Sequence, residues 1–388
     1  MPHTPISRRS VLGWGALAAL GVPLAGAGTA YADPTFPQPS EDPPLAAIRS
    51  YGDMVRELER LERTSRYPVT VETLSEIGTA ESLSEQGREL YVATVGTGDT
   101  AVWVQGRIHG NEPYGLDGIM TVLKSLATSG AAQWRQIREE FTVHVIPVYN
   151  PDGSEMNIRE TVLWDRENDV PRLDGNGNEQ RIDLNRDWAP DRFVARESLA
   201  WYEYWTRVKP AYALDIHHQG LKRDYETGEP ITFSLGISLA PGGPTLPGLE
   251  GGTYDVITRQ MQSHVWLETK DYGFIGIDKY DVGPGTVIDI RGGVVSAMML
   301  GLDYDGMNPT GHSNPAVFFE TSGNTRDGNI GHKARGKFVK QNVLGLTAWL
   351  DGLADGSVFE VDPAIWDDQI PGTQVERYFT DWGGIIPA

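Results

Sequence analysis

The segment Ala101–Leu126, AVWVQGRIHGNEPYGLDGIMTVLKSL, contains the transition on which the fold prediction rests. Residues 101–105 form a valine-rich apolar run that is typical of a buried strand. A short polar loop with His109 and Glu112 follows, and Pro113 comes directly before apolar side chains at helical spacing. We therefore expect a strand, a loop with potential metal ligands and a helix, in this order.

Short apolar runs and helical patterns alternate along most of the chain. Several of the runs are almost continuously apolar, as expected where helices cover both faces of a sheet. We predict an α/β fold with a mixed, mostly parallel central sheet flanked by helices. The predicted strands are Leu90–Val95, Ala101–Gln105, Phe141–Val148, Ala211–Ile216 and Ala316–Phe319, and the predicted helices are Tyr51–Arg63, Leu116–Leu126, Asp191–Val208, Tyr254–Glu268 and Lys333–Leu353.

The composition excludes several classes of function. The 388 residues contain 33 Lys and Arg against 53 Asp and Glu, and the formal net charge of -20 disfavours nucleic acid and anionic membranes as partners. Cysteine is absent, which excludes disulfides, cysteine-based zinc sites and thiol nucleophiles. Any bound metal ion must therefore be held by His, Asp or Glu.

The N-terminal region has the pattern of an export signal. Arg8 and Arg9 precede a mildly apolar run, and the small-x-small triplet Ala30-Tyr31-Ala32 follows it. The pattern resembles a bacterial twin-arginine signal, so we expect cleavage after Ala32 and a secreted product without stable membrane association. The expected organisation is a signal peptide at 1–32, a Pro-rich spacer at 33–44, a single domain at 45–355, and a tail at 356–388 that packs on the domain or trails from it.

His109 and Glu112 are the first candidate metal ligands. A His-x-x-Glu pair alone is weak evidence, because in a glutamate-rich chain it also arises by chance in surface loops. His217 and His218 follow the predicted strand Ala211–Ile216, and in open α/β sheets ligands gather at the carboxyl ends of strands. Adjacent strand residues face opposite ways, so only one of these two histidines reaches a given site. Two imidazoles and one carboxylate are a zinc-binding set that leaves a coordination position for water.

Two further segments carry groups that suit hydrolysis. Glu320 follows the apolar run Ala316–Phe319, where a carboxylate is either solvated by a loop or serves as a general base beside a metal ion. In Asp183-Leu184-Asn185-Arg186, the planar guanidinium of Arg186 matches a carboxylate with two parallel hydrogen bonds, and Asn185 adds donors. The pair favours a substrate with a free carboxylate, although an arginine in so acidic a chain also forms ordinary surface ion pairs.

Taken together, the motifs are similar to those of zinc metallocarboxypeptidases of the carboxypeptidase A type. The resemblance extends from Tyr51 to Glu320 and includes the helix Lys333–Leu353. It implies a secreted carboxypeptidase with one zinc ion that hydrolyses the last peptide bond of peptides or proteins. The motifs that occur in the order of that family are His109-x-x-Glu112, Asn150-Pro151-Asp152-Gly153, Asp183-Leu184-Asn185-Arg186, His217 and Glu320.

The resemblance also implies a role for the matched residues of the metal centre. His109, Glu112 and His217 would bind zinc, so His217 is preferred over His218. Glu320 would be the general base. Asp183 would accept a hydrogen bond from His109 and fix the tautomer of that imidazole.

On the substrate side, the resemblance implies that Asn185 and Arg186 bind the terminal carboxylate. Arg166 would polarise the scissile carbonyl. Tyr280 would close over the substrate, with Tyr272 and Tyr304 as alternatives for this role.

Two other functions are compatible with these residues. An amidohydrolase of the same fold, acting on N-acyl amino acids or cell-wall stem peptides, would use the same zinc ligands and the same Asn-Arg pair. A secreted, non-catalytic binding protein on this scaffold is less favoured, because it has no need of Glu320 as a base. The side-chain preference at the cleaved residue stays open, with Ile288 and Asp289 as candidate pocket residues.

Overall fold

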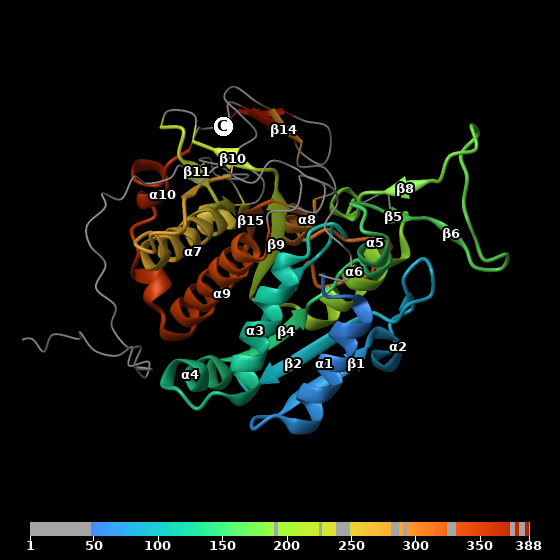
Figure 1. The fold of residues 1–388 in the computed structure, drawn as a ribbon, viewed down its shortest axis with the longest axis horizontal. Coiled ribbons are helices and arrows are strands. Elements are labelled where there is room, and N and C mark those ends of the chain that lie inside the picture. Colours follow the sequence, from blue (N-terminus) through green and yellow to red (C-terminus); the bar gives the residue numbers. More distant parts are fainter. Residues whose placement is uncertain are drawn as a thin grey trace, which may run out of the picture. The chain divides into compact units, whose positions relative to one another are not determined.

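The computed structural model describes most of the chain beyond residue 47 (Figure 1). All described residues belong to Phe36–Ala388, the second of two compact units into which the chain divides. The predicted signal peptide and spacer lie outside the described residues, as do the side chains of Ile288 and Asp289. The described ranges are 48–189, 193–224, 227–237, 249–280, 287–289, 293–323, 331–372, 377–379 and 385–387.

A mixed sheet of eight strands forms the centre of this unit. The central run β4–β3–β9–β15 is parallel, as is the pair β12–β13, whereas β1–β2, β2–β4 and β15–β12 are antiparallel. The predicted mixed, mostly parallel sheet is confirmed. In spatial order the strands are β1 (Val69–Thr73), β2 (Tyr91–Gly96), β4 (Phe141–Ile146), β3 (Thr100–Gly106), β9 (Tyr212–Gln219), β15 (Ala316–Ser322), β12 (Phe233–Ile237) and β13 (Ile277–Lys279).

Helices cover both faces of the sheet and bury two separate apolar clusters. The first cluster includes side chains from α1, α3, α4, α7 and α9, and the second includes side chains from α6 and α8. Within β3, Val102 and Val104 belong to the first cluster and Trp103 to the second, as strand alternation requires. The helices are α1 (Tyr51–Thr64), α2 (Leu74–Ile77), α3 (Tyr114–Thr128), α4 (Ala132–Glu140), α5 (Pro151–Met156), α6 (Arg196–Val208), α7 (Thr253–Thr269), α8 (Val294–Leu300), α9 (Gly331–Asp355) and α10 (Ile365–Asp368).

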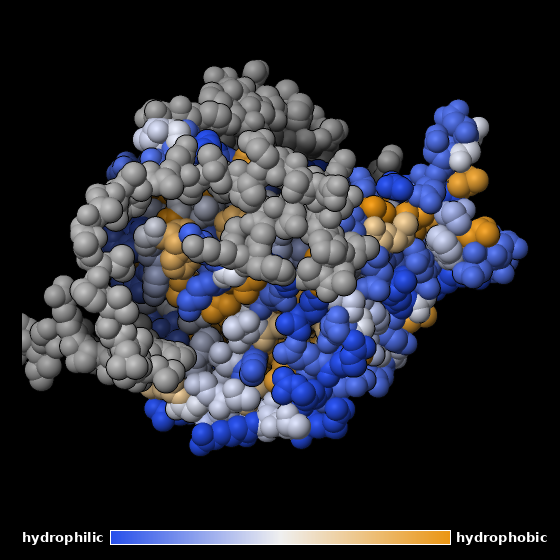
Figure 2. Space-filling view, in the orientation of Figure 1, coloured by the Kyte–Doolittle hydropathy of each residue, from blue (hydrophilic) through white to orange (hydrophobic). Residues whose placement is uncertain are grey.

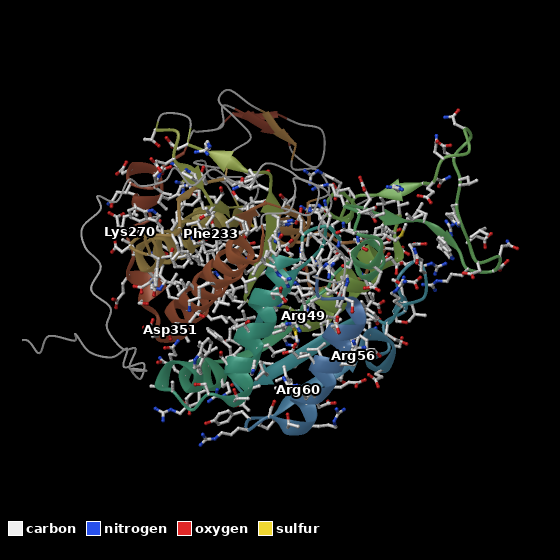
Figure 3. The ribbon with its side chains drawn as sticks, viewed as in Figure 1. Arg49, Arg56, Arg60, Phe233, Lys270 and Asp351 are labelled. Atoms are coloured by element: carbon white, nitrogen blue, oxygen red, sulfur yellow. The ribbon has the colours of Figure 1, made fainter. Side chains whose placement is uncertain are left out.

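On the first face, α9 contacts both α3 and α7, and the three helices run side by side (Figure 1). Phe233 of β12 is fully buried in this layer (Figure 3). Its ring requires the glycine at 345 in α9, because a Cβ there would lie 2.8 Å from Phe233 Cζ. This close approach holds α9 against the half of the sheet that carries β12 and β15.

Local side-chain contacts set the ends of two predicted helices. α1 begins at Tyr51, as predicted, directly after a capping box formed by Ser50 and Asp53. It ends at Thr64, one residue beyond the predicted end at Arg63. α6 begins at Arg196, later than the predicted Asp191, which lies outside the described residues. The amide of Arg196 donates to the carboxylate of Glu85, which comes from a distant loop, and such a cap is not visible in the local sequence pattern.

Residues 356–372 pack against α7 and α9. After the short turn η4 (Ser357–Glu360), α10 contacts α7. Trp366 and Ile370 are buried in the same apolar cluster as α7 and α9. Their burial removes apolar surface from water and stabilises the packing of this segment on the helices.

Several short strands lie outside the central sheet. Residues 164–181 form a hairpin arm that is mostly hydrophilic, although Val170 and Leu173 are exposed (Figure 2). None of the helices in the described ranges is long and apolar enough to cross a membrane. The short strands pair as β5 (Thr161–Val162) with β8 (Arg181–Ile182), β6 (Trp164–Asp165) with β7 (Val170–Pro171), β10 (Lys222–Arg223) with β11 (Pro230–Ile231), and β14 (Val287–Asp289) with β16 (Arg377–Phe379), which also pairs with β17 (Ile385–Pro387).

Candidate metal centre

His109 and Glu112 lie in the loop between β3 and α3. The amide of Glu112 donates to the carbonyl of His109, which turns the chain back and places both side chains together. His109 Nδ1 lies 2.7 Å from Glu112 Oε1, and both residues are buried. Pro113 precedes the first turn of α3, as predicted from its position in the sequence.

His217 of β9 completes a cluster of three potential ligands. Its Nδ1 lies 3.3 Å from His109 Nδ1 and 3.4 Å from Glu112 Oε2. The three residues offer ligand atoms that all lie within 4.8 Å of one another. Burial disfavours the charged form of Glu112, but the two histidines hold its pKa below the usual range.

His218 faces the opposite side of the sheet. Its Nε2 accepts a hydrogen bond of 2.9 Å from the amide of Tyr114, at the start of α3. Burial lowers the pKa of His218 to about 3, so its imidazole is neutral and acts as an acceptor. The structure thus brings His217, and not His218, to His109 and Glu112.

Glu320 reaches the cluster through the pairing of β15 with β9. The parallel register places Glu320 directly beside His217, so both side chains point to the same face of the sheet. Burial raises the pKa of Glu320 to about 7; His217 opposes this shift, and Glu112 adds to it. Glu320 Oε2 is buried and has no hydrogen-bond partner among the described residues. A carboxylate oxygen in this condition is suited to a proton or a ligand.

Asp183 contacts the outer side of His109. Its Oδ1 lies 3.2 Å from His109 Nε2, which is the contact that the family resemblance implies. Its Oδ2 accepts bonds of 3.1 and 3.0 Å from the guanidinium of Arg159. Although burial opposes ionisation, these contacts with His109 and Arg159 keep the pKa of Asp183 below its usual range.

Arg159 is a site residue that sequence reasoning missed. Its Nη1 lies 3.3 Å from His109 Nδ1 and 3.7 Å from Glu112 Oε1. Arg166, which the sequence assigned to the site, instead donates to the backbone carbonyls of Ser84 and Glu85. The hairpin arm begins between the two arginines and carries Arg166 away from the cluster. The local sequence does not indicate which arginine lies at the cluster, because four arginines lie between Gly153 and Ile182.

Asn185 and Arg186 lie in the short turn η2 (Leu184–Arg186) that follows Asp183. Asn185 is buried, and its Oδ1 accepts a bond of 3.0 Å from the amide of Val294. Arg186 is exposed and donates to the carbonyl of Asn185. The structure therefore leaves the Arg186 guanidinium accessible to a ligand from solvent.

Tyr280 follows β13 and packs its ring edge-on against Phe318, at 5.3 Å between ring centroids. Burial, with a further contribution from the charge of Glu320, raises the pKa of its phenol. Of the two alternatives, Tyr272 is exposed and Tyr304 packs on Phe193. Tyr280 is thus the candidate whose ring contacts the strand that carries Glu320.

The chain is similar in sequence and in fold to known carboxypeptidases. Residues 60–209 match the family described as "Zinc carboxypeptidase". A metallo-carboxypeptidase from Burkholderia cenocepacia has a TM-score of 0.51 at 18% identity, covering 79% of this chain and 69% of that one. The carboxypeptidase A from Helicoverpa armigera has a TM-score of 0.54 at 17% identity, covering 81% of this chain and 74% of that one. The fold is that of the zinc carboxypeptidases.

Sequence similarity to curated proteins covers a smaller part of the chain than the similarity in fold to the zinc carboxypeptidases does. "Probable carboxypeptidase 2" from Arthroderma benhamiae is 28% identical over 134 residues, which is 34% of this chain. The match spans 22% of that relative's length. The family match at 60–209 includes His109, Glu112 and Asp183 but ends before His217 and Glu320. The central sheet of the fold is what brings these last two residues to the others.

The donor set fits a zinc ion. Two imidazoles approach through Nδ1, one carboxylate lies between them, and all three groups are buried. Among the described residues, this is the group of three or more His, Asp and Glu side chains whose ligand atoms lie close enough to hold a metal. Nitrogen and oxygen donors in this number are typical of a catalytic zinc site.

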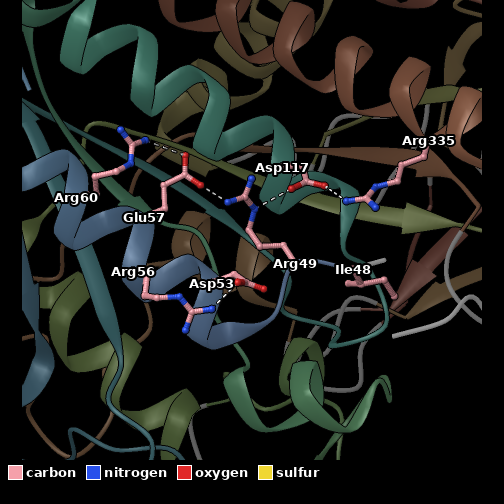
Figure 4. A pocket seen from close by; sticks show the side chains of 8 residues that line it. All are labelled: Ile48, Arg49, Asp53, Arg56, Glu57, Arg60, Asp117 and Arg335. Carbon is pink, nitrogen blue, oxygen red and sulfur yellow. Dashed lines mark hydrogen bonds and ion pairs between the residues drawn. The ribbon is translucent and has the colours of Figure 1, made fainter. Parts of the chain in front are cut away.

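A cavity of about 510 Å³ lies elsewhere on the zinc carboxypeptidase fold, beside α1 and α3 (Figure 4). Arg49 bridges the carboxylates of Glu57 and Asp117, and Asp117 also accepts a bond from Arg335. Charges of both signs are therefore paired within its lining. This cavity contains none of the residues of the candidate metal centre.

Proposed function

We propose that this chain is a zinc-dependent carboxypeptidase that hydrolyses the C-terminal peptide bond of peptides or proteins. The observation that carries the proposal is the row formed by His217 and Glu320 on neighbouring strands, with His109 and Glu112 facing it from the loop after β3. The family match and the fold of the structural neighbours support it.

His109, Glu112 and His217 would hold the zinc ion. When bound, zinc supplies Lewis-acid polarisation of a carbonyl group and lowers the pKa of water. The negative charge of Glu112 compensates part of the charge of a divalent ion, and the two neutral imidazoles complete the donor set.

Glu320 is assigned the proton transfers. Its Oε2, which has no hydrogen-bond partner among the described residues, accepts the proton of the attacking water and then delivers it to the leaving amine. A carboxylate whose pKa is raised toward neutrality by burial is suited to both steps. Arg159 contacts His109 and Glu112, where its guanidinium can donate hydrogen bonds to the oxygen that becomes negative during attack.

Arg186 is assigned to the free carboxylate of the substrate. Arg186 is exposed and follows, by three residues, the Asp183 that contacts His109, and its guanidinium can hold this group with two parallel hydrogen bonds. Fixing the chain end determines which carbonyl reaches the reacting groups, so the position of Arg186 selects the last peptide bond. This step separates a carboxypeptidase from a general peptidase.

The decisive experiment compares matched peptides with a free and an amidated C-terminus, and a variant of Arg186. We expect zinc-loaded protein to cleave only the free form. In Arg186→Ala, kcat/KM for the free form falls roughly 10- to 150-fold, because a hydrogen bond to a charged group is worth about 1.5–3 kcal/mol. Zinc content, measured by metal analysis, stays at the wild-type level. Equal cleavage of both peptides by the wild type would exclude the proposed function.

Arg159 and Arg166 form a matched pair for testing the oxyanion contact. We expect Arg159→Ala to lower kcat by about 100- to 1,000-fold, the usual cost of removing one such donor. Arg166→Ala keeps kcat, because Arg166 binds only backbone carbonyls of Ser84 and Glu85 in the described structure. Steady-state kinetics of both variants at full zinc loading makes the comparison. The reverse pattern would return the role to Arg166.

A further inference from the structure

A chain of buried hydrogen bonds leads from an indole to one of the proposed zinc ligands. Trp103 Nε1 donates to Gln105 Oε1 at 2.7 Å, and Gln105 Nε2 donates to Asp215 Oδ2 at 2.8 Å. The same Asp215 oxygen lies 2.9 Å from His217 Nε2. None of these four residues is more than 3% exposed. The chain therefore ends on the imidazole of His217, on the side away from His109.

The chemistry of its first member fixes the direction of every bond in this chain. The indole of Trp103 can only donate, so the carbonyl oxygen of Gln105 must accept. The amide nitrogen of Gln105 then faces Asp215, whose carboxylate accepts. His217 must in turn donate from Nε2, so the neutral form of its imidazole, which is the form that binds a metal, carries the lone pair on Nδ1. Nδ1 is the atom that faces His109 and Glu112.

The sheet supports this arrangement through its register. Gln105 of β3 pairs directly with Asp215 of β9, so the two side chains stand next to each other on one face. His217 follows Asp215 by two residues and therefore points to the same face. The hydrogen bonds are thus held by paired strands and not by a loop.

The environment of Asp215 differs from that of Asp183, the carboxylate on the other imidazole. Asp183 also receives two hydrogen bonds from Arg159 and has a side chain that is 23% exposed. Asp215 is buried, its Oδ1 has no hydrogen-bond partner among the described residues, and its Oδ2 contacts Gln105 and His217. A buried carboxylate costs free energy unless positive charge compensates it. The group best placed to do so is His217 together with an ion on its far side.

We infer that Asp215 is a positioning residue for the metal centre, which holds His217 with its Nδ1 lone pair toward the ion, and that Gln105 fixes the orientation of Asp215. The inference rests on the proposed function, because it assumes that His217 binds zinc. Carboxylates that hold a ligating imidazole in this way strengthen metal binding without touching the metal. Asp215 and Gln105 extend the site through the sheet toward Trp103.

The test measures zinc affinity by competition with a chelator in the full chain. In Asp215→Asn, which preserves shape and one acceptor oxygen, we expect the zinc Kd to rise roughly 10- to 100-fold. Gln105→Met is expected to raise Kd in the same direction by a smaller factor. The double variant should match Asp215→Asn, because Gln105 acts only through the carboxylate. The visible spectrum of the Co²⁺-substituted protein should shift in Asp215→Asn, since the ligand field reports the position of His217.

Gln262→Met is the matched control. Gln262 is equally buried, but its amide donates to the backbone carbonyls of Gly236 and Phe318. We expect this variant to lose stability toward urea while its zinc Kd and Co²⁺ spectrum stay at wild-type values. If Asp215→Asn behaves like this control, the inference is overturned and Asp215 is structural.

The failure of the inference can be told apart from failure of the proposed function. A wild-type protein that binds no Zn²⁺ would overturn the proposed function and the inference together. A wild type that binds Zn²⁺ tightly, with an unchanged Kd in Asp215→Asn, would overturn only the inference. Should Asp215→Asn not fold, Gln105→Met decides, since it leaves the carboxylate in place: a raised Kd supports the inference and an unchanged one overturns it.

Discussion

Replacing Glu320 with glutamine is expected to reduce kcat by roughly 100- to 10,000-fold, the range that a general acid-base residue contributes. The amide has nearly the same shape as the carboxylate, but it cannot take a proton from water or return one to a leaving amine. Because Glu320 is not one of the three clustered ligand residues, zinc binding should be retained. Single-turnover kinetics with a free-carboxylate peptide, together with metal analysis, measures both properties on one sample.

Glu320→Asp is the matched variant for this experiment. It keeps the acid but withdraws it by one methylene from the cluster, so we expect an activity between those of the wild type and Glu320→Gln. The physical reason is that proton transfer depends on the distance from the carboxylate to the reacting atoms, and Glu320 Oε2 is buried without a hydrogen-bond partner among the described residues. Substantial turnover by the Gln variant would remove Glu320 from the role of base and leave the metal-ligand assignment untouched.

The second large effect is expected at two adjacent histidines. His217→Ala should lose both zinc and activity, because one of the three clustered donors is removed. His218→Gln should keep both, because His218 lies on the opposite face and a glutamine can still accept the hydrogen bond from the amide of Tyr114. Zinc stoichiometry and peptide hydrolysis are measured in parallel for the two variants.

A stability measurement completes this comparison. Urea unfolding of both metal-free variants shows whether either substitution damages the core, since both histidines are buried. Retention of one zinc ion by His217→Ala together with its loss from His218→Gln would reverse the ligand assignment. It would also contradict the register that places His217 beside Glu320.

Much of the fold was predictable because its elements are long and their apolar spacing is regular. The burial of Met54, Leu58 and Leu61 along α1 follows the spacing of these residues in the sequence. The start of α6 was not predictable in the same way. Its first amide is capped by Glu85, more than a hundred residues earlier, and no local pattern reports such a contact.

The candidate site also contains residues that could be predicted from the sequence and residues that could not. His109, Glu112 and His217 could be proposed because each follows a strand predicted from the sequence and has a metal-binding side chain. Arg159 could not be proposed. The chain between Gly153 and Asp183 forms the hairpin arm, and the sequence does not show which arginine of this segment lies beside the cluster. Asp215 was visible next to His217 in the sequence, but its contact with Gln105 exists only once β3 and β9 are paired.

The pairing of β9 with β15 has a consequence for how this molecule can vary. Because His217 and Glu320 are set side by side by backbone hydrogen bonds, a slip of one residue between the two strands would turn Glu320 to the opposite face. The chemistry therefore constrains the strands and leaves the surrounding loops comparatively free to change in length. New substrate preferences can arise in those loops while the spacing between the proposed base and the proposed ligand is inherited unaltered.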